Sequence, residues 1–396
     1  MVQTITNARI VTPTEDFIGT LQIEDECITD ISKTSKIYND AINLNQQWLT
    51  PGCIDIHSDY IEKELHPRPS ANFPMPFAFH FMDQRAAACG ITTLFSAISF
   101  SSNEHARRSY EGALSLSKSL DELSESGSIR HYIHSRLDPN SEKVVDYLDA
   151  MKEIKSLKMV VVNESIPGQR QFRLEEVIEK RAKILGITVD EYREKVTKEI
   201  EEKSKIDKRK EIQEAFEDNI PLGSHDDTTV KHVEEGQLYG SSLSEMPTTI
   251  EAARKAKELD MWVCMGAPNY YRGGSHCGNL SCADAMKEDL VDMLCSDYHF
   301  PTMLSAVIRM INDGISPSKA INYVSLNPAK FLKMDQDLGS IDLGKKADLV
   351  AFNSDKGFAQ VSHVWVDGRL KFTSSIDSIN TLNNTTIKKQ KEEVQI

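Results

Sequence analysis

The chain has 396 residues, of which 40% are hydrophobic and 27% are charged. This composition is typical of a globular protein and excludes a wholly disordered, collagen-like or membrane-spanning chain. The 46 lysines and arginines against 60 acidic residues give a net charge of −14, which argues against nonspecific binding to nucleic acid or to an anionic membrane. Seven cysteines without a Cys-x-x-Cys pair, and a polar start without an apolar signal region, lead us to expect a cytoplasmic protein with reduced thiols.

Short strand-like segments occupy both ends of the chain. Near the start they cover residues 5–11, 19–23 and 27–31, with turn-prone residues between them. The same alternation of short strand-like segments and turns returns after Gly339 and ends at Phe372. We therefore predict a small β-sandwich domain built from both termini, residues 1–50 plus 339–372.

Between these ends, β-rich runs alternate with amphipathic helical stretches. This order over residues 51–338 predicts a (β/α)8 TIM-like barrel of the α/β class. No glycine-rich dinucleotide fingerprint or P-loop favours an open nucleotide-binding sheet instead. The runs are residues 53–57, 92–98, 130–136, 158–162, 220–225, 262–265 and 294–297.

Two segments depart from this alternation. Residues 170–218 form a charge-dense helical insertion, which we interpret either as a pair of solvated surface helices or as a mobile lid over the barrel mouth. Residues 373–396 are polar, and we expect a frayed tail.

Histidines and acids follow several of the expected strands. His57 and Asp59 would project on the same side at a strand's carboxyl end, where barrel enzymes place their chemistry. His225 and Asp297 end two later runs, and Glu164 could add a carboxylate between two metals. Each has an ordinary alternative as a cap or loop hydrogen bond. Their repetition at strand ends favours a divalent-metal site. We expect Asp297 and His225 to be catalytic, with Asp297 as the base that activates water.

Cationic residues near these strand ends suit a polyanionic substrate. A guanidinium fork, adjacent glycines with exposed amides and a hydroxyl are grouped at Arg272, Gly273, Gly274 and Ser275. A tight turn with a surface arginine is the alternative. Further candidates for substrate binding are Lys63, Arg68, Arg136, for which a structural salt bridge is an equal alternative, and Arg170.

Several longer strings resemble the amidohydrolase superfamily and, within it, the α-D-ribose 1-methylphosphonate 5-triphosphate diphosphatases. The resemblance covers residues 1 to about 372. The strings are His57-Ser58-Asp59 with Glu62-Lys63, Ala88-Cys89-Gly90-Ile91-Thr92-Thr93, Pro167-Gly168-Gln169-Arg170-Gln171-Phe172, Ser224-His225-Asp226-Asp227, residues 265–269 with 272–276, and Ser296-Asp297-Tyr298.

The resemblance implies a metal-dependent hydrolase that cleaves a ribose 5-triphosphate between its α and β phosphoryl groups and releases pyrophosphate. The implied ligands are His57, Asp59, His225 and Asp297, with Glu164 as a bridging carboxylate and His276 as a further candidate. The implied cofactor is one or two divalent ions, zinc first, with manganese or iron as alternatives. Ser165 stands where the family commonly has histidine, which leaves the metal count and the exact substrate open.

Two other functions compete with this one. The same metal chemistry could hydrolyse a cyclic amide or imide or deaminate a ring, although the phosphate-suited cations favour the first function. A non-catalytic binding or assembly protein is the second alternative. As partners we expect a phosphorylated small molecule and further copies of this chain, but neither nucleic acid nor a membrane.

Overall fold

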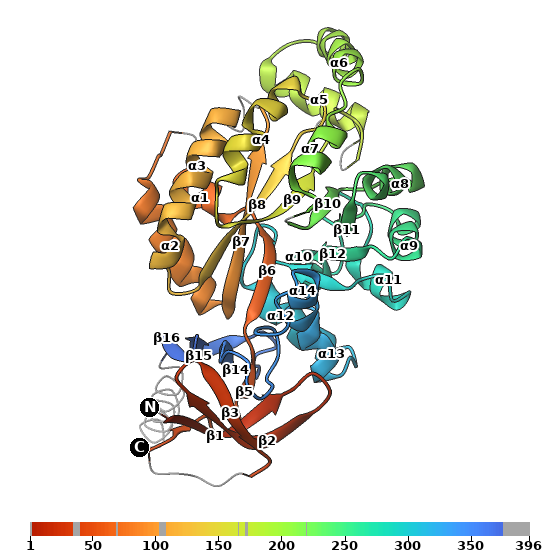
Figure 1. Cartoon of the computed structure of the whole chain (residues 1–396). Helices are drawn as coiled ribbons and strands as arrows, with labels where there is room; N and C mark the ends of the chain where they lie inside the picture. Colours follow the sequence, from red (N-terminus) through yellow and green to blue (C-terminus); the bar gives the residue numbers. More distant parts are fainter. Residues whose placement is uncertain are drawn as a thin grey trace, which may run out of the picture.

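The protein consists of a helix-covered barrel and a smaller sheet beneath it (Figure 1). The computed structural model describes residues 2–34, 40–68, 70–102, 108–164, 166–170, 173–218 and 220–374. Ser165 lies outside the described residues, as do residues 375–396 of the expected tail.

Eight parallel strands form the wall of the barrel, each paired with its neighbours in chain order. The wall closes where Ser58 of the first strand bridges Asp297 beyond the last. The expected (β/α)8 barrel is therefore confirmed. The strands are β6 (Cys53–Ser58), β7 (Ile91–Phe100), β8 (Arg130–Leu137), β9 (Leu157–Val162), β10 (Leu222–His225), β11 (Ser241–Glu245), β12 (Trp262–Gly266) and β13 (Met293–Cys295).

Helices surround this wall and connect successive strands (Figure 1). Two 3-10 turns, Ser124–Ser126 and Glu142–Val144, lie beside β8 and α4. The helices are α1 (Tyr60–Leu65), α2 (Met75–Ala88), α3 (Tyr110–Leu123), α4 (Val145–Lys152), α5 (Leu174–Leu185), α6 (Val189–Lys203), α7 (Arg209–Phe216), α8 (Val230–Leu238), α9 (Ile250–Glu258), α10 (Ala267–Arg272), α11 (Cys282–Lys287), α12 (Thr302–Asn312), α13 (Pro317–Asn322) and α14 (Leu326–Phe331).

Apolar side chains fill both faces of the barrel wall. On β9, Met159 and Val161 belong to the cluster inside the barrel, whereas Val160 and Val162 pack in the cluster between wall and helices. Because a parallel strand is covered on both faces, its sequence is continuously apolar rather than alternating. This is why a strand such as β9 could be recognised as a short apolar run.

The strands of the two termini join in one further sheet, whose halves enclose a common core. The order is β16-β15-β14-β5-β1-β2-β3, with β4 paired to β1. Ile10 and Leu21 from the first half pack in the same cluster as Leu349 and Trp365 from the second. This confirms the expected small β-sandwich. Its strands are β1 (Val2–Val11), β2 (Asp16–Glu24), β3 (Cys27–Ser32), β4 (Ile42–Asn43), β5 (Trp48–Pro51), β14 (Leu349–Asn353), β15 (Gln360–Val366) and β16 (Arg369–Thr373).

The junction between sheet and barrel is short and buried. Gly52 alone separates β5 from β6, and a side chain there would collide with Thr92. Arg130 at the start of β8 forms ion pairs with both Asp348 and Asp367 of the small sheet. The small sheet is thus attached at the amino ends of the barrel strands, opposite to the end where His57 and His225 lie. The boundaries at residues 50 and 339 stay a prediction.

The insertion differs from a simple helix pair. Residues 170–218 contain three helices, α5, α6 and α7. The first two lie at the far end of the molecule from the small sheet (Figure 1). Only Val196 of α6 is buried, as expected for a solvated helix. Helix α7 instead buries Ile212 and Phe216 in the barrel's outer core.

One buried carboxylate ties α2 to the barrel wall and generates a stability prediction. Asp83 Oδ1 accepts hydrogen bonds from the amides of Ser128 and Ile129 and lies 2.9 Å from His131 Nε2. Burial alone would raise the pKa of Asp83, but the bonds to His131 and the two amides hold that pKa below its usual range.

We predict that Asp83→Asn lowers the free energy of unfolding at neutral pH by about 1.5–3 kcal/mol, the usual contribution of hydrogen bonds to a charged group. Because the folded pKa is depressed, the carboxylate stabilises the protein above its unfolded pKa of about 3.9 and loses that contribution as the pH falls through the folded value. Denaturant unfolding at neutral and acid pH should therefore show a difference that shrinks in acid. The exposed Asp149→Asn is the control and should change little at either pH.

Candidate active site

The closure of the barrel brings its first and last strands together at the carboxyl end. The amide of Asp297 donates to the carbonyl of His57 at 3.0 Å, and the amide of Asp59 donates to the carbonyl of Asp297 at 2.9 Å. Asp297 adopts a positive φ of 54°, which turns the chain back toward β6 at this point. Two histidine and aspartate motifs that are 240 residues apart in the numbering therefore share one hydrogen-bonded corner.

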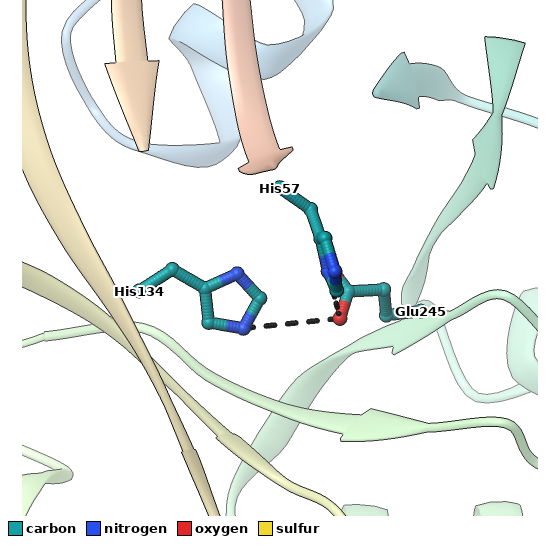
Figure 2. A group of neighbouring side chains, drawn as sticks. All are labelled: His57, His134 and Glu245. Carbon is teal, nitrogen blue, oxygen red and sulfur yellow. Dashed lines mark ion pairs between the residues drawn. The ribbon is translucent and has the colours of Figure 1, made fainter. Parts of the chain in front are cut away.

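Three buried side chains converge beside this corner (Figure 2). His57 Nδ1 lies 2.9 Å from Glu245 Oε2, and His134 Nε2 lies 3.8 Å from the same oxygen. The two imidazole rings meet edge to face at 4.9 Å. His134 Nδ1 lies 3.0 Å from the carbonyl of Ile56, so it donates there and directs the lone pair of Nε2 toward Glu245.

A second group shares His57 and opens toward solvent. His57, Asp59 and Asp297 offer ligand atoms within 4.8 Å of one another, as do His57, His134 and Glu245. His225 lies at the edge of both groups, with Nε2 3.5 Å from Glu245 Oε2 and Nδ1 3.0 Å from Asp226 Oδ2. Strands β6, β8, β10 and β11, together with Asp297 two residues after β13, thus contribute to one cluster.

The electrostatics of the cluster keep Glu245 ionised and His134 neutral. Burial by itself would raise the pKa of Glu245, but the adjacent His57 holds it at about 2. Burial lowers the pKa of His134 to about 3, so that imidazole is neutral. Burial works against protonation of His57 too, yet Glu245 and Asp59 raise its pKa well above the ordinary value. A divalent cation would compete with that proton for the same lone pair.

The donor atoms fit a divalent metal ion. Buried atoms without a hydrogen-bond partner among the described residues include His57 Nδ1, His134 Nε2, both ring nitrogens of His225 and both carboxylate oxygens of Glu245. Buried polar atoms are normally satisfied, so this concentration requires an explanation. Neutral imidazole and ionised carboxylate are the ligands that zinc and similar ions take. The cluster of His57, His134 and Glu245 can therefore bind a metal ion.

The structure does not bring Glu164 to this cluster, contrary to expectation. Its oxygens pair with Arg170 and Arg209, and it belongs to neither ligand group found among the described residues. Arg170 is buried as well, and its guanidinium donates to the carbonyl of His225 and to Asp227. With Nε and Nη1 engaged inside the protein and a side chain that is only 4% exposed, Arg170 lines neither of the two hollows described below.

In the expected phosphate loop after β12, the amides of the two glycines are already used in backbone hydrogen bonds. The amide of Gly273 donates to Tyr270 and that of Gly274 donates to Asn269, so both close α10 rather than point at an anion. Residue Arg272 contacts the hydroxyl of Tyr298 at 3.4 Å. His276 lies edge-on to Tyr298 with ring centroids 5.9 Å apart and is not in either ligand group.

Two hollows border the ligands. A cavity of about 680 Å³ is lined by Asp59 and by Lys63, Arg68 and Arg108. A second, of about 60 Å³, is lined by Asp226, Asp297, Arg272, Ser275 and His276. Arg136 reaches neither and instead pairs with Asp59 at 2.7 Å, which is the salt bridge left open from its sequence position.

Sequence reasoning missed two of the residues that meet here. Glu245 ends β11, which was absent from the expected strands because its sequence, Ser-Ser-Leu-Ser-Glu, has one large apolar residue. His134 precedes Arg136 by two positions on β8 and thus shares its face, a spacing that could have singled it out.

Comparison with known proteins agrees with this fold. Residues 48–371 match the amidohydrolase family. The chain therefore belongs to the amidohydrolase family and is a hydrolase of that family.

Among individual proteins, the chain is 29% identical over 377 residues to the alpha-D-ribose 1-methylphosphonate 5-triphosphate diphosphatase of Escherichia coli (strain K12). That alignment covers 93% of this chain and 100% of the relative. An adenine deaminase of Clostridium botulinum (strain ATCC 19397 / Type A) is 34% identical over 118 residues, 27% of this chain and 20% of that protein.

A solved structure extends the likeness in fold. N-acetylglucosamine-6-phosphate deacetylase from Pasteurella multocida superposes with a TM-score of 0.62 at 13% identity, covering 94% of this chain and 100% of that one. In the described part of the chain, we find no helix with the length and apolar character needed to cross a membrane.

We predict that Glu245→Gln weakens zinc binding by more than the roughly 10–100-fold typical of a residue that only supports a ligand. The amide keeps the shape of the side chain but removes the charge that faces three imidazoles. Competition with a chelator measures the dissociation constant. Glu251→Gln, the same change on the exposed face of α9, is the control, and equal zinc affinity in both variants would remove Glu245 from the ligand set.

Proposed function

We propose that this member of the amidohydrolase family is a metal-dependent diphosphatase. It cleaves α-D-ribose 1-methylphosphonate 5-triphosphate, or a closely related ribose 5-triphosphate, to the 5-phosphate and pyrophosphate in phosphonate metabolism. The observation that carries the proposal is the similarity to the Escherichia coli diphosphatase along the whole length of that protein. The positions of the cations around the ligand cluster support it independently.

Cations line both hollows that border the ligands. Lys63 donates to the carbonyl of Tyr298 at 3.0 Å, which places the ammonium group between the two hollows. Within the described parts of the chain neither Arg68 nor Arg272 forms an ion pair, and each lines one of the hollows, so both guanidinium groups can donate hydrogen bonds to an anion. Arg108 is already paired with Glu62. A triphosphate, with charge at several oxygens, suits such a two-sided arrangement better than a neutral ring does.

The metal ligands in this proposal are His57, His134, Glu245, Asp59 and Asp297, with His225 beside them. Zinc is the first choice of ion because histidine and carboxylate ligands dominate, and manganese or iron are the alternatives. When bound, a divalent ion lowers the pKa of water and neutralises charge on phosphoryl oxygens.

The residues of the chain then have separate roles. Burial raises the pKa of Asp297, so its carboxylate holds a proton more readily than an exposed aspartate does. We assign Asp297 as the base that takes a proton from water while the water oxygen bonds to phosphorus and the bridging oxygen leaves with pyrophosphate. His225 orients that water, and Lys63, Arg68 and Arg272 bind the phosphate oxygens.

Two further functions are alternatives to the diphosphatase. The partial similarity to an adenine deaminase supports ring deamination as the second candidate, and cyclic-amide hydrolysis uses the same cluster. A non-catalytic assembly protein would fold and associate without metal. The homo-oligomer and the cytoplasmic location stay predictions.

The test is to incubate zinc-loaded protein with ribose 5-triphosphates, adenine and cyclic amides, and to follow products by phosphorus NMR and mass. We expect equal amounts of pyrophosphate and 5-phosphate, loss of activity after chelation, and its return with zinc. Asp297→Asn should lower kcat by about 10²–10⁴, the usual contribution of a general base.

Release of ammonia or opening of a ring without pyrophosphate would replace this function by the second candidate. Full activity of an Asp297→Asn protein that retains its metal would remove Asp297 from the base role.

A further inference from the structure

A buried series of ion pairs lies behind the ligand cluster. Arg209 pairs with Glu164 Oε1, Arg170 Nε donates to Glu164 Oε2 at 2.8 Å, and Arg170 Nη1 donates to Asp227 Oδ1 at 2.8 Å. The exposed fractions of these four side chains are 10% or less. We call Arg209, Glu164, Arg170 and Asp227 the buried ion-pair chain.

One end of the buried ion-pair chain is attached to the strands that carry His225 and Glu245. Arg170 Nη1 also donates to the carbonyl of His225 at 2.8 Å. Asp227 Oδ2 accepts a hydrogen bond from Ser244 Oγ at 2.6 Å, and Ser244 directly precedes Glu245. The ends of β10 and β11 are thus held together from the side that faces away from the metal ligands.

The other end belongs to the insertion. Arg209 is the first residue of α7, and Ile212 and Phe216 anchor that helix in the outer core of the barrel. Arg209 Nη1 also lies 2.9 Å from Asp207, in the connection from α6. The helical insertion therefore reaches the ligand strands through a continuous set of charged contacts.

The contacts of these residues exclude two simpler roles. Glu164 has both oxygens engaged by arginines, so it does not offer a ligand atom to the metal cluster. The Nε and Nη1 donors of Arg170 are directed at a carbonyl and two carboxylates of the protein. Removal of any member leaves a buried charge without its partner, so the four residues act as a unit.

We propose that the buried ion-pair chain is a positioning device through which the insertion sets the geometry, and hence the metal affinity, of His225 and Glu245. In this role Glu164 and Arg170 are positioning residues and touch neither metal nor substrate. The inference rests on the metal site of the proposed function and is independent of the substrate.

The first test uses Arg209→Met, because Arg209 lies on α7 and links the helices of the insertion to Glu164. We expect zinc affinity, measured by chelator competition, to fall about 10–100-fold, as for other residues that support metal ligands. The number of zinc ions bound per chain at saturation should stay the same. Arg193→Met on α6, which breaks an exposed pair with Glu175 in the same insertion, is the control and should bind zinc normally.

The second test separates a positioning residue from a ligand. Glu164→Gln keeps an acceptor for Arg170 but removes the charge. We expect weaker zinc binding with the full number of ions per chain, counted by mass spectrometry of metal. Loss of one ion per chain would show that Glu164 is a ligand and would overturn the assignment.

A milder variant guards against loss of folding. Ser244→Ala removes a single hydrogen bond to Asp227, and we expect a smaller decrease in zinc affinity with little change in the unfolding temperature of the metal-free protein. If the unaltered protein binds zinc and all three variants bind it equally well, the coupling is overturned while the metal site stands. If the unaltered protein binds no zinc, both the coupling and the proposed metal site are overturned.

Discussion

Two backbone hydrogen bonds between the first strand of the barrel and the turn after its last strand govern the position of everything else in the site. They join Asp297 to His57 and Asp59, and they require Asp297 to adopt a left-handed backbone conformation. Because the strands are parallel, closing this corner places the carboxyl ends of β8, β10 and β11 at the same rim of the barrel. The ligand cluster is thus a consequence of barrel closure.

The cluster is organised around one fully buried carboxylate. Glu245 is approached by three imidazoles, none in hydrogen-bond geometry with it, and this leaves a group of donors that a cation would satisfy. Metal ligands depend on supporting residues for their orientation. Here the support comes from the carbonyl of Ile56 behind His134 and from Arg170 and Asp227 behind His225 and Glu245.

Much of the fold could be predicted from the sequence because β-rich runs alternate with helical stretches along the chain. Seven of the barrel strands were expected from such runs, whereas the serine-rich β11 was not, and Glu245 was missed with it. His57, Asp59 and Asp297 were found because they lie at or just after the ends of such runs. The pairing of Glu164 with Arg170 and Arg209 could not be predicted, since it depends on the docking of α7, which no local pattern records. Likewise, the glycines after Arg272 suggested free amides, but helix termination uses them.

The most direct test of this account is a crystal structure of the zinc-loaded protein, with the metal located by anomalous scattering at the zinc edge. The account predicts an ion at bonding distances of about 2.0–2.2 Å from nitrogen or oxygen atoms of His57, His134 and Glu245. An ion coordinated by Glu164, or zinc found only at surface sites away from the corner formed by β6 and β13, would contradict it.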